Sequence, residues 1–543
     1  MSKLLKEKKG KEIALAVISL ITAVLSYGYV ILHPTIGIDD TELERYVLNG
    51  WEPLFNRPTL VIPGLVLRFD RYIPFLYDIL GALLIVLAAL VWIYVFDKVS
   101  GHKIHFLSYC LFAVIFISSP IICETYIFYL HNGEGAAFLM TAFATLAYYN
   151  YINSNKIRFL LVSLVLSVLS VGCYESMALV YSVAAIAVCF FDKKYSNRKY
   201  TWKLFWKETL ACGITVLTGI VFRSIISNIL PRILKFDATG KILNAHSGSF
   251  KYWFLNNPLV IAKDLVYKFI ARYIASGLYF KWIVVFVILI LLMIVYLGYL
   301  IYKKEWIRAL MIAVMAIVPW LLVIYQMEMT PYRAALGLMI WMPVAGLIFC
   351  EEILSGLNKR LKSVIVVLTG LLVLGILILQ VSDSYKYYKL DYDVYQSDLA
   401  YTKSVFDYLN DNCGDKPVVF VGKYEMPDEL KERAYLLFDS EEYDKISKLF
   451  NLDKTKAWHY YCDDYGYQLY DVGHVDPLTW AYYADPGYED GEIVDFCNMH
   501  GMNIRKLSNP DWNEINEVRP NEIWPESGSV VDMNEFVVVR IGK

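Results

Sequence analysis

Eleven apolar segments, separated by short polar stretches, constrain the fold of this chain more than any other feature. They fall near residues 12–32, 75–96, 104–122, 134–151, 158–172, 177–191, 208–230, 282–301, 307–326, 335–351 and 363–381. A run of about 18 apolar residues or more is long enough to cross a bilayer as a helix, and 57% of the residues are hydrophobic. We therefore expect a polytopic α-helical membrane protein with about 11 transmembrane helices.

The charged residues divide the chain into two parts. Residues 391–543 contain 31 acidic and 14 basic residues, a net charge of −17, whereas the other 390 residues contain 22 acidic and 37 basic residues, a net charge of +15. A basic membrane part followed by an acidic polar part predicts two domains, at 1–381 and 382–543. An acidic soluble domain would repel phosphates, so no nucleic-acid partner is expected.

The lysines and arginines of the short loops predict the orientation in the membrane. If the N-terminus is cytoplasmic, the basic residues at 3–11, 98–103, 156–158, 193–207, 303–308 and 359–362 all lie inside. This arrangement satisfies the positive-inside rule, because the short outer loops contain only one basic residue, Arg333. The apolar stretch after the basic start is too long for a signal-peptide core, so we expect an uncleaved first helix.

Three outer segments are long: the first outer loop at 33–74, the middle outer loop at 231–281, and the tail from about 382. The aromatic and basic pattern of 250–273 favours one or two helices in the membrane interface. In the tail, hydrophobic periodicity predicts an extracytoplasmic α/β domain, with helices at 395–412 and 491–501, a buried strand at 417–422 and a hairpin at 528–543.

The nine cysteines show neither a CxxC pattern nor a cluster with histidine, so no metal site is indicated. Six of them lie in or beside apolar segments, where cysteine behaves as a small buried hydrophobic residue. The other three, Cys413, Cys462 and Cys497, lie in the tail, and a disulfide between two of them stays open.

Two adjacent aspartates, Asp39 and Asp40, follow the first apolar segment in "IGIDDTELERYVLNGW". Thr41 and Glu44 form a capping box, which predicts that a helix begins there. The aspartates would then lie at the positive end of the helix dipole. One aspartate could simply assist the cap, but Thr41 already supplies it. Because unneeded charge beside a bilayer is costly, the pair is a candidate functional site.

Further polar residues gather at the predicted outer ends of the helices. They are Arg45, Arg57, Arg68 and Arg71 in the first outer loop; Glu124, His131, Asn132, Glu134, Tyr174, Glu175, Glu328 and Arg333 in short loops; and Arg223 and Arg272 beside the middle loop. Arginine suits phosphate because it is always charged and can bind two oxygens at once. For any single arginine, snorkelling to the interface is the simpler explanation, and a lone His131 is more typical of a surface histidine.

One run of residues resembles the signature of a known family. The pattern DD-x4-R-x4-GW-x5-RP, formed by Asp39, Asp40, Arg45, Gly50, Trp51, Arg57 and Pro58, is similar to that of the bacterial type II glucosyltransferases, which are polytopic GT-C enzymes. "TPYRAALG" and the C-terminal "IWPESGSVVDMNEFVVVRIG" resemble two further motifs of the family. "VGCYES" resembles a third, with Glu175 where the family has glutamine.

The resemblance implies an inverting glycosyltransferase of the bacterial plasma membrane. It would move a single hexose, most simply glucose, from polyprenyl phosphate to a cell-surface glycan or wall polymer on the outer face. Asp39 or Asp40 would be the general base. Arg45, Arg57, Arg272 and Arg333 would bind the donor phosphate, and the acceptor or supporting residues would be Trp51, Glu124, His131, Asn132, Tyr174 and Glu175. No cofactor is expected, although paired aspartates could hold a divalent ion.

Two other functions remain as alternatives. A lipid-linked glycan polymerase or ligase would also have an external site, and it would differ by transferring a whole glycan instead of one sugar. A lipid-sugar flippase or transporter would favour charged residues at the bilayer midplane and similar halves. The charges of this chain lie at the ends of the apolar segments, which favours the enzyme.

Overall fold

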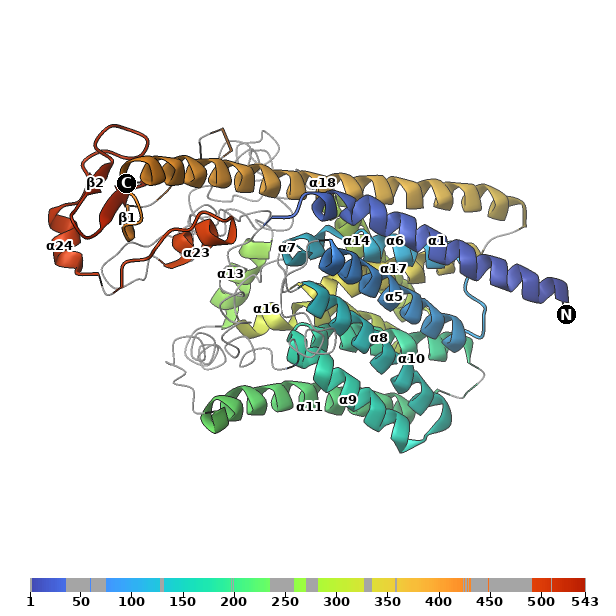
Figure 1. Ribbon diagram of the computed structural model, residues 1–543. Coiled ribbons are helices and arrows are strands. Elements are labelled where there is room, and N and C mark those ends of the chain that lie inside the picture. The colour runs from blue at the N-terminus through green and yellow to red at the C-terminus, as the bar shows by residue number, and fades with distance from the viewer. Residues whose placement is uncertain are drawn as a thin grey trace.

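Long helices make up most of the structure, a computed structural model shown in Figure 1. The structure describes residues 2–35, 59, 75–126, 131–196, 198, 200–234, 258–269, 282–326, 335–356, 359–422, 424, 427, 429–430, 448, 491–508 and 510–542. The helices of the bundle and its loops are α1 (Ser2–Leu32), α5 (Leu76–Val99), α6 (Phe106–Ile117), η1 (Pro120–Ile122), α7 (Cys123–Tyr126), α8 (His131–Ser154), α9 (Ile157–Cys173), α10 (Met177–Tyr195), α11 (Trp202–Leu234), α13 (Pro258–Phe269), α14 (Trp282–Tyr302), α15 (Trp306–Ile317), η4 (Val318–Trp320), α16 (Leu321–Gln326), α17 (Leu336–Ser355) and α18 (Lys359–Asn412).

The helices are those of a membrane-embedded protein. In the described part of the chain, seven helical stretches are long and apolar enough to cross a bilayer, namely Lys9–Leu32, Leu76–Val99, Trp202–Ile226, Trp282–Tyr302, Trp306–Tyr325, Leu336–Ser355 and Ser363–Asn412. Two shorter apolar stretches are Phe106–Ile122 and Ile157–Cys173. Every one of the eleven predicted segments coincides with a helix, and the number that cross the membrane stays a prediction.

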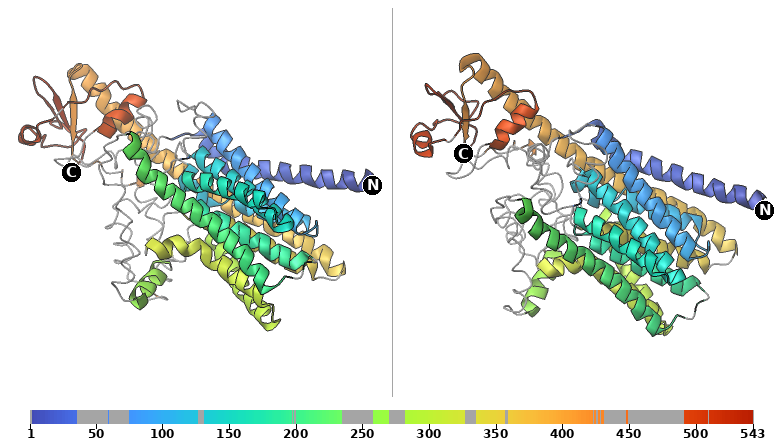
Figure 2. Two further views of the ribbon diagram at one scale, coloured as in Figure 1. Left: turned by 90° about the horizontal axis from the view of Figure 1, so that it is seen from below. Right: turned by 60° about the horizontal axis from the view of Figure 1, so that its bottom comes forward.

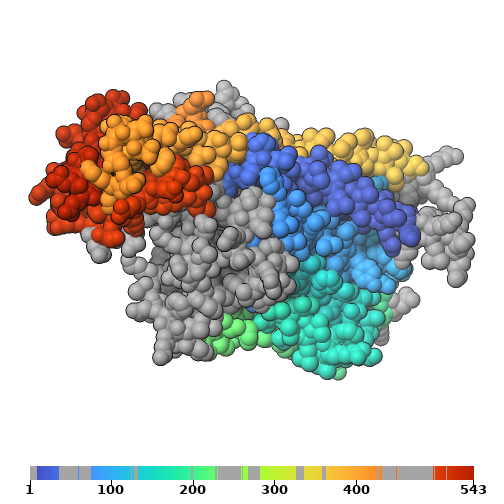
Figure 3. Space-filling view, viewed as in Figure 1, coloured from blue at the N-terminus to red at the C-terminus, as the bar shows by residue number. Residues whose placement is uncertain are grey.

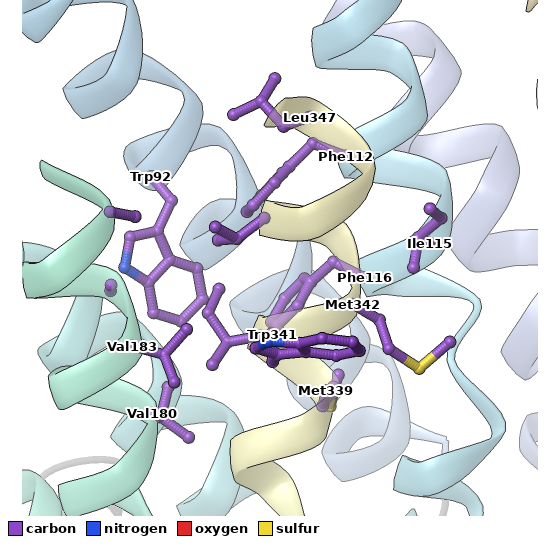
Figure 4. Close-up of a cluster of buried hydrophobic side chains, with 14 of the residues drawn as sticks. Trp92, Phe112, Ile115, Phe116, Val180, Val183, Met339, Trp341, Met342 and Leu347 are labelled. Atoms are coloured by element: carbon purple, nitrogen blue, oxygen red, sulfur yellow. The ribbon is translucent and has the colours of Figure 1, made fainter. Parts of the chain in front are cut away.

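The centre of the bundle is a core of buried aromatic and aliphatic side chains. Side chains of α5, α6, α10 and α17 converge there (Figure 4). The indole of Trp92 is fully buried and meets Phe116 edge to face, with 5.2 Å between the ring centroids. Its indole N–H donates to the Thr145 hydroxyl at 3.3 Å, so the polar atom of this large side chain is satisfied inside the core.

One end of the bundle, here called the basic end, collects the lysine- and arginine-rich loops. Lys103 donates to the carbonyl of Tyr195 at 3.0 Å, and Lys207 donates to Asn155 at 2.7 Å. Two adjacent carboxylates on α17 are paired at this end as well. Glu351 accepts a hydrogen bond from the backbone N–H of His105 at 2.9 Å, and Glu352 forms ion pairs with Lys194 and Arg308. Hydrogen-bonded buried charges of this kind fix how neighbouring helices meet.

The N-terminus lies at the basic end, and the C-terminal part of the chain lies at the opposite end in all views (Figures 1 and 2). The two are joined by α18, a single helix of 54 residues, which is roughly 81 Å long at 1.5 Å per residue. It follows the bundle and continues into the C-terminal part, along the upper edge of the molecule in Figure 3. The sequence predicted two separate elements, an apolar span ending at 381 and a helix beginning at 395. The structure joins them without a break.

The C-terminal part, here called the C-terminal unit, contains a three-stranded sheet with helices on both faces. Its elements after α18 are β1 (Val418–Val421), α23 (Gly491–Met499), α24 (Trp512–Glu517), β2 (Val530–Asp532) and β3 (Val537–Arg540). The strand order is β1-β3-β2, with β1 parallel and β2 antiparallel to β3. The end of α18 and α23 pack on one face, and α24 packs on the other.

Several elements of this unit confirm the sequence expectations. The predicted buried strand at 417–422 is β1, whose four residues are all buried. The predicted helix at 491–501 is α23, and the predicted C-terminal hairpin is formed by β2 and β3. Cys413 and Cys497 are both free thiols, so these two cysteines form no disulfide with each other.

A histidine couples α18 to α23 within this unit. Nδ1 of His500 lies 2.7 Å from the carbonyl oxygen of Phe496, and Nε2 lies 2.6 Å from the hydroxyl of Tyr395 on α18. Because a carbonyl can only accept, Nδ1 carries the proton and Nε2 accepts from Tyr395. Burial lowers the pKa of His500 below its ordinary value. The neutral imidazole is therefore the form that the folded unit favours.

The docking of α23 should weaken in acid. Because the pKa of His500 is lower in the folded than in the unfolded state, the stabilisation is complete above about pH 6.5, the unfolded pKa, and is lost as the pH falls through the lower folded pKa. Hydrogen exchange of the α23 amides, corrected for intrinsic rates, should show falling protection between these values. A His500→Phe variant should lack that pH dependence, and equal pH dependence in both proteins would contradict the prediction.

Candidate active site

The end of the bundle opposite the basic end collects acidic side chains and is here called the acidic end. Asp78 begins α5, Glu134 lies in the first turn of α8, and Glu175 follows α9. On α18, Asp383 contacts the start of α14, and Asp391 contacts Thr35 just beyond the end of α1. The C-terminal unit lies beyond this end (Figure 1).

A residue of the first outer loop, Thr59, is fixed at the end of α9. Its backbone N–H donates to the carbonyl of Gly172 at 3.3 Å, and its hydroxyl donates to the carbonyl of Leu169. The same oxygen lies 3.4 Å from Sγ of Cys173. The last carbonyls of a helix have no partner within the helix. Thr59 supplies one from a distant part of the chain and is 6% exposed.

Gly172 is required for this contact. A Cβ atom at position 172 would lie 2.6 Å from the hydroxyl oxygen of Thr59, which is closer than non-bonded atoms approach. The absence of a side chain therefore lets the loop lie directly against the end of α9. The first two residues after α9 are Tyr174, which is buried, and Glu175.

The other end of the same loop segment is fixed on α18. The hydroxyl of Thr35, three residues after α1 ends, donates to Oδ2 of Asp391 at 2.8 Å. Thr35 is 7% exposed and Asp391 is 1% exposed. Aromatic rings hold the two helices together six residues earlier on each, where Tyr29 meets Tyr385 edge to face at 5.0 Å. A hydrogen bond to a buried carboxylate is stronger than one between neutral groups.

An ion pair joins α9 to α11 at the acidic end. A guanidinium nitrogen of Arg223 lies 3.1 Å from Oε2 of Glu175, and both side chains are partly exposed. The two helices approach closely one turn earlier, where a Cβ on Gly219 would lie 3.2 Å from the Val171 side chain. Gly219 and Arg223 are four residues apart and share one face of α11, whereas Glu175 lies in the turn two residues beyond the end of α9. The close approach of the helices brings Arg223 within reach of the Glu175 carboxylate in that turn.

A second carboxylate of α18, that of Asp383, caps the start of α14 at the acidic end. Oδ2 of Asp383 accepts from the backbone N–H of Trp282, the first residue of α14, at 2.8 Å. Asp383 is fully buried. The first N–H groups of a helix lack internal partners and carry partial positive charge, so a carboxylate from another helix satisfies and stabilises this end.

The structure describes only some of the predicted site residues. Tyr174 is buried, and Glu175 pairs with Arg223, as described above. Glu124, His131 and Asn132 lie in α7 and at the start of α8, but their side chains fall outside the described residues. The remaining predicted residues also fall outside them: Asp39, Asp40, Arg45, Trp51, Arg57, Arg272 and Arg333. Their roles stay predictions.

Sequence reasoning missed three residues that the structure places at this site: Thr35, Thr59 and Asp391. For the two threonines, the sequence held a clue in their position. Thr35 lies four residues before the DD-x4-R-x4-GW-x5-RP run, and Thr59 follows it directly. Asp391 had no such signal, since it lies among many polar residues of the tail and its threonine partner is 356 positions away.

The arrangement brings together the two anchored threonines that flank residues 36–58, a partly exposed carboxylate–guanidinium pair and the capped start of α14, beside apolar helices. Several of those helices expose apolar side chains, including Val221 and Phe222 of α11 next to Arg223. A cation at the edge of an apolar helix surface suits an anionic group on a lipid. Among the described residues, no group of three potential metal ligands lies together.

Comparison with known proteins identifies one family. Residues 28–350 match the family model described as glucosyl transferase GtrII. The matched region includes the ends of α1 and α9, Thr59 and Arg223, and it ends before α18. Comparisons with curated proteins and with solved structures give no match.

Replacing Gly172 by alanine should destabilise the protein, although alanine usually favours a helix over glycine by about 1 kcal/mol. The new methyl group would collide with Thr59, and overpacking of this kind costs about 1–3 kcal/mol. Gly213→Ala is the matched control, because a Cβ there meets nothing within 4 Å. Thermal unfolding in detergent should show a lower midpoint for Gly172→Ala and an unchanged or higher one for Gly213→Ala. Equal midpoints would argue against the contact.

Proposed function

Because the chain belongs to the GtrII glucosyl transferase family, we propose that it is an inverting glycosyltransferase that moves one glucose from polyprenyl phosphate to a cell-surface glycan. The observation that carries this proposal is the placement of the two residues that flank the family's sequence signature. Thr59 directly follows the Arg57–Pro58 end of the signature and is anchored at the end of α9, beside Tyr174 and Glu175. Thr35, on the other side of the signature, binds Asp391 of α18, so both flanking residues lie at the acidic end of a membrane-embedded bundle.

The proposed reaction is a single displacement. Asp39 or Asp40 accepts the proton of an acceptor hydroxyl, whose oxygen forms a bond to the anomeric carbon of the donor sugar. The bond between that carbon and the phosphate oxygen breaks, and polyprenyl phosphate leaves with the electron pair. Attack on the side opposite the leaving group inverts the configuration at the anomeric carbon. A monophosphate leaving group does not require a metal, and we propose none.

Arginines are proposed to bind the phosphate of the donor. Arg45, Arg57, Arg272 and Arg333 would offset the negative charge that grows on the leaving group. Trp51, Glu124, His131, Asn132, Tyr174 and Glu175 are proposed to line the acceptor side or support the other residues. Arg223 joins this set, since its ion pair holds Glu175 at the acidic end.

We also propose that the acidic end faces outward from a bacterial plasma membrane. The basic loops gather at the end where the N-terminus lies, and such loops favour the cytoplasm. The residues to 381 then form the catalytic membrane domain. Residues 382–543 form an extracytoplasmic α/β domain whose aromatic side chains help to hold the glycan.

The test is sugar transfer by purified protein from synthetic polyprenyl-phosphate-glucose, with a bacterial wall-glycan fraction as acceptor. Asp39→Asn or Asp40→Asn should lower the rate by about 100- to 10,000-fold, the usual contribution of a general base. Asp407→Asn, at an exposed position of α18, is the control and should leave the rate unchanged. Full activity in both aspartate variants would remove the proposed base, and transfer of an intact lipid-linked glycan would indicate a polymerase or ligase.

A further inference from the structure

Two buried threonines bracket the loop segment that carries the family signature. The segment from 36 to 58 contains the whole DD-x4-R-x4-GW-x5-RP run, and the residues on either side of it are Thr35 and Thr59. Both are less than a tenth exposed. Each hydroxyl donates to a different helix, so the two ends of the segment are fixed at two separate places in the bundle.

The first anchor lies on α18. Oδ2 of Asp391 accepts from Thr35 at 2.8 Å, whereas Oδ1 has no hydrogen-bond partner among the described residues. A buried carboxylate with one unsatisfied oxygen costs free energy. Stability alone would favour a neutral acceptor at this position. The observed role of Asp391 is the buried, directional hydrogen bond that it forms with Thr35, a residue 356 positions away in the sequence.

The second anchor lies on α9. Thr59 uses both its backbone N–H and its hydroxyl, on the carbonyls of Gly172 and Leu169. Two hydrogen bonds from one residue fix its position and its orientation together. The glycine at 172 leaves the space that this contact needs.

We propose that Thr35, Asp391 and Thr59 are positioning residues that hold the two ends of the catalytic loop at fixed places on the acidic end of the bundle. The proposal rests on the proposed function, which assigns the general base to Asp39 or Asp40 within that loop. Fixing both ends of a segment limits how far its middle can move from the two attachment points. A general base must be placed accurately, since an error of about 1 Å can cost about 100-fold in rate.

The first anchor also connects the catalytic loop to the C-terminal unit. From Asp391, α18 continues as a helix to Asn412 and contributes Val405 and Leu409 to the core of that unit. A displacement of the unit that carries α18 with it therefore also moves Asp391, the acceptor of the Thr35 hydrogen bond.

The experiment compares kcat and the donor KM of Thr35→Val and Thr59→Val with those of the wild type. Valine keeps the approximate shape of threonine and removes the hydroxyl donor. Each variant should lower kcat by about 10- to 100-fold, with the KM for polyprenyl-phosphate-glucose nearly unchanged because the donor site is intact. Thr35→Ser and Thr59→Ser, which retain the hydroxyl, should restore most of the activity.

Thr22→Val is the matched control. Thr22 is fully buried in α1, as Thr35 is buried just beyond it, but its hydroxyl donates only to Ile18 of the same helix at 2.8 Å. This variant removes a buried hydroxyl without touching the loop, so its kcat should match the wild type. An equal loss of kcat in Thr22→Val and Thr35→Val would overturn the proposal, because general loosening of the bundle would explain both.

A double variant tests whether Thr35 and Asp391 act together. If they form one anchor, Thr35→Val combined with Asp391→Ala should lower kcat no further than the more harmful single change. Additive losses would overturn the anchor, as would unchanged kcat in folded Thr35→Val and Thr59→Val. If the Asp391→Ala protein does not fold, the kcat values of Thr35→Val and Thr59→Val test the proposal by themselves. Absence of transfer by the wild type would overturn the proposed function and this inference together, whereas active, unchanged variants would overturn only the inference.

Discussion

The structure depends on buried carboxylates along one face of α18. Asp383 satisfies the first N–H of α14, and Asp391 holds Thr35 at the end of α1. Gln380, about one turn before Asp383, accepts a hydrogen bond from Ser118 beyond α6 at 2.7 Å. One helix therefore fixes the ends of three others, which lie far apart in the sequence. In an apolar bundle, side chains pack almost equally well in several registers, and polar contacts of this kind select one of them.

The two ends of the bundle use charge differently. At the basic end, the buried carboxylate of Glu351 is surrounded by donors, including the hydroxyl of Tyr195 at 3.0 Å. At the acidic end, Oδ1 of Asp391 lacks a hydrogen-bond partner in the described part of the chain, and the Glu175–Arg223 pair is partly exposed. Functional sites commonly sacrifice local stability in this way. The contrast agrees with chemistry located at the acidic end.

The helices could be predicted from sequence because each apolar segment carries its own signal. The strand β1 and the hairpin of β2 and β3 could also be predicted, since their alternation and length are local properties. The continuity of α18 could not be predicted from sequence, because the first half of this helix is apolar and the second half is polar. The polar residues after 381 resemble those of an exposed helix, yet Asp383, Asp391 and Asp398 are all buried. Burial of such residues is decided by what packs against them, which the local sequence does not record.

The site was predictable only in part for the same reason. The aspartate and arginine pattern of residues 39–57 predicts a site by residue type, and Glu175 was predicted to belong to it. The contact between Thr59 and Gly172 gives no such signal, because threonine and glycine are ordinary residues and the pair is separated by more than a hundred positions. Only the packing of α9 against the loop reveals why position 172 has no side chain.

The unbroken course of α18 sets a length scale for the proposed glycan acceptor. From Asp391, at the acidic end of the bundle, to Asn412, where the helix ends beside the sheet, the rise of 1.5 Å per residue gives roughly 32 Å. Because α18 is one rigid helix, the distance between the acidic end and the sheet stays constant. A chain that touched the sheet and the acidic end at once would need to be about that long, and a shorter one could occupy only one of the two places at a time.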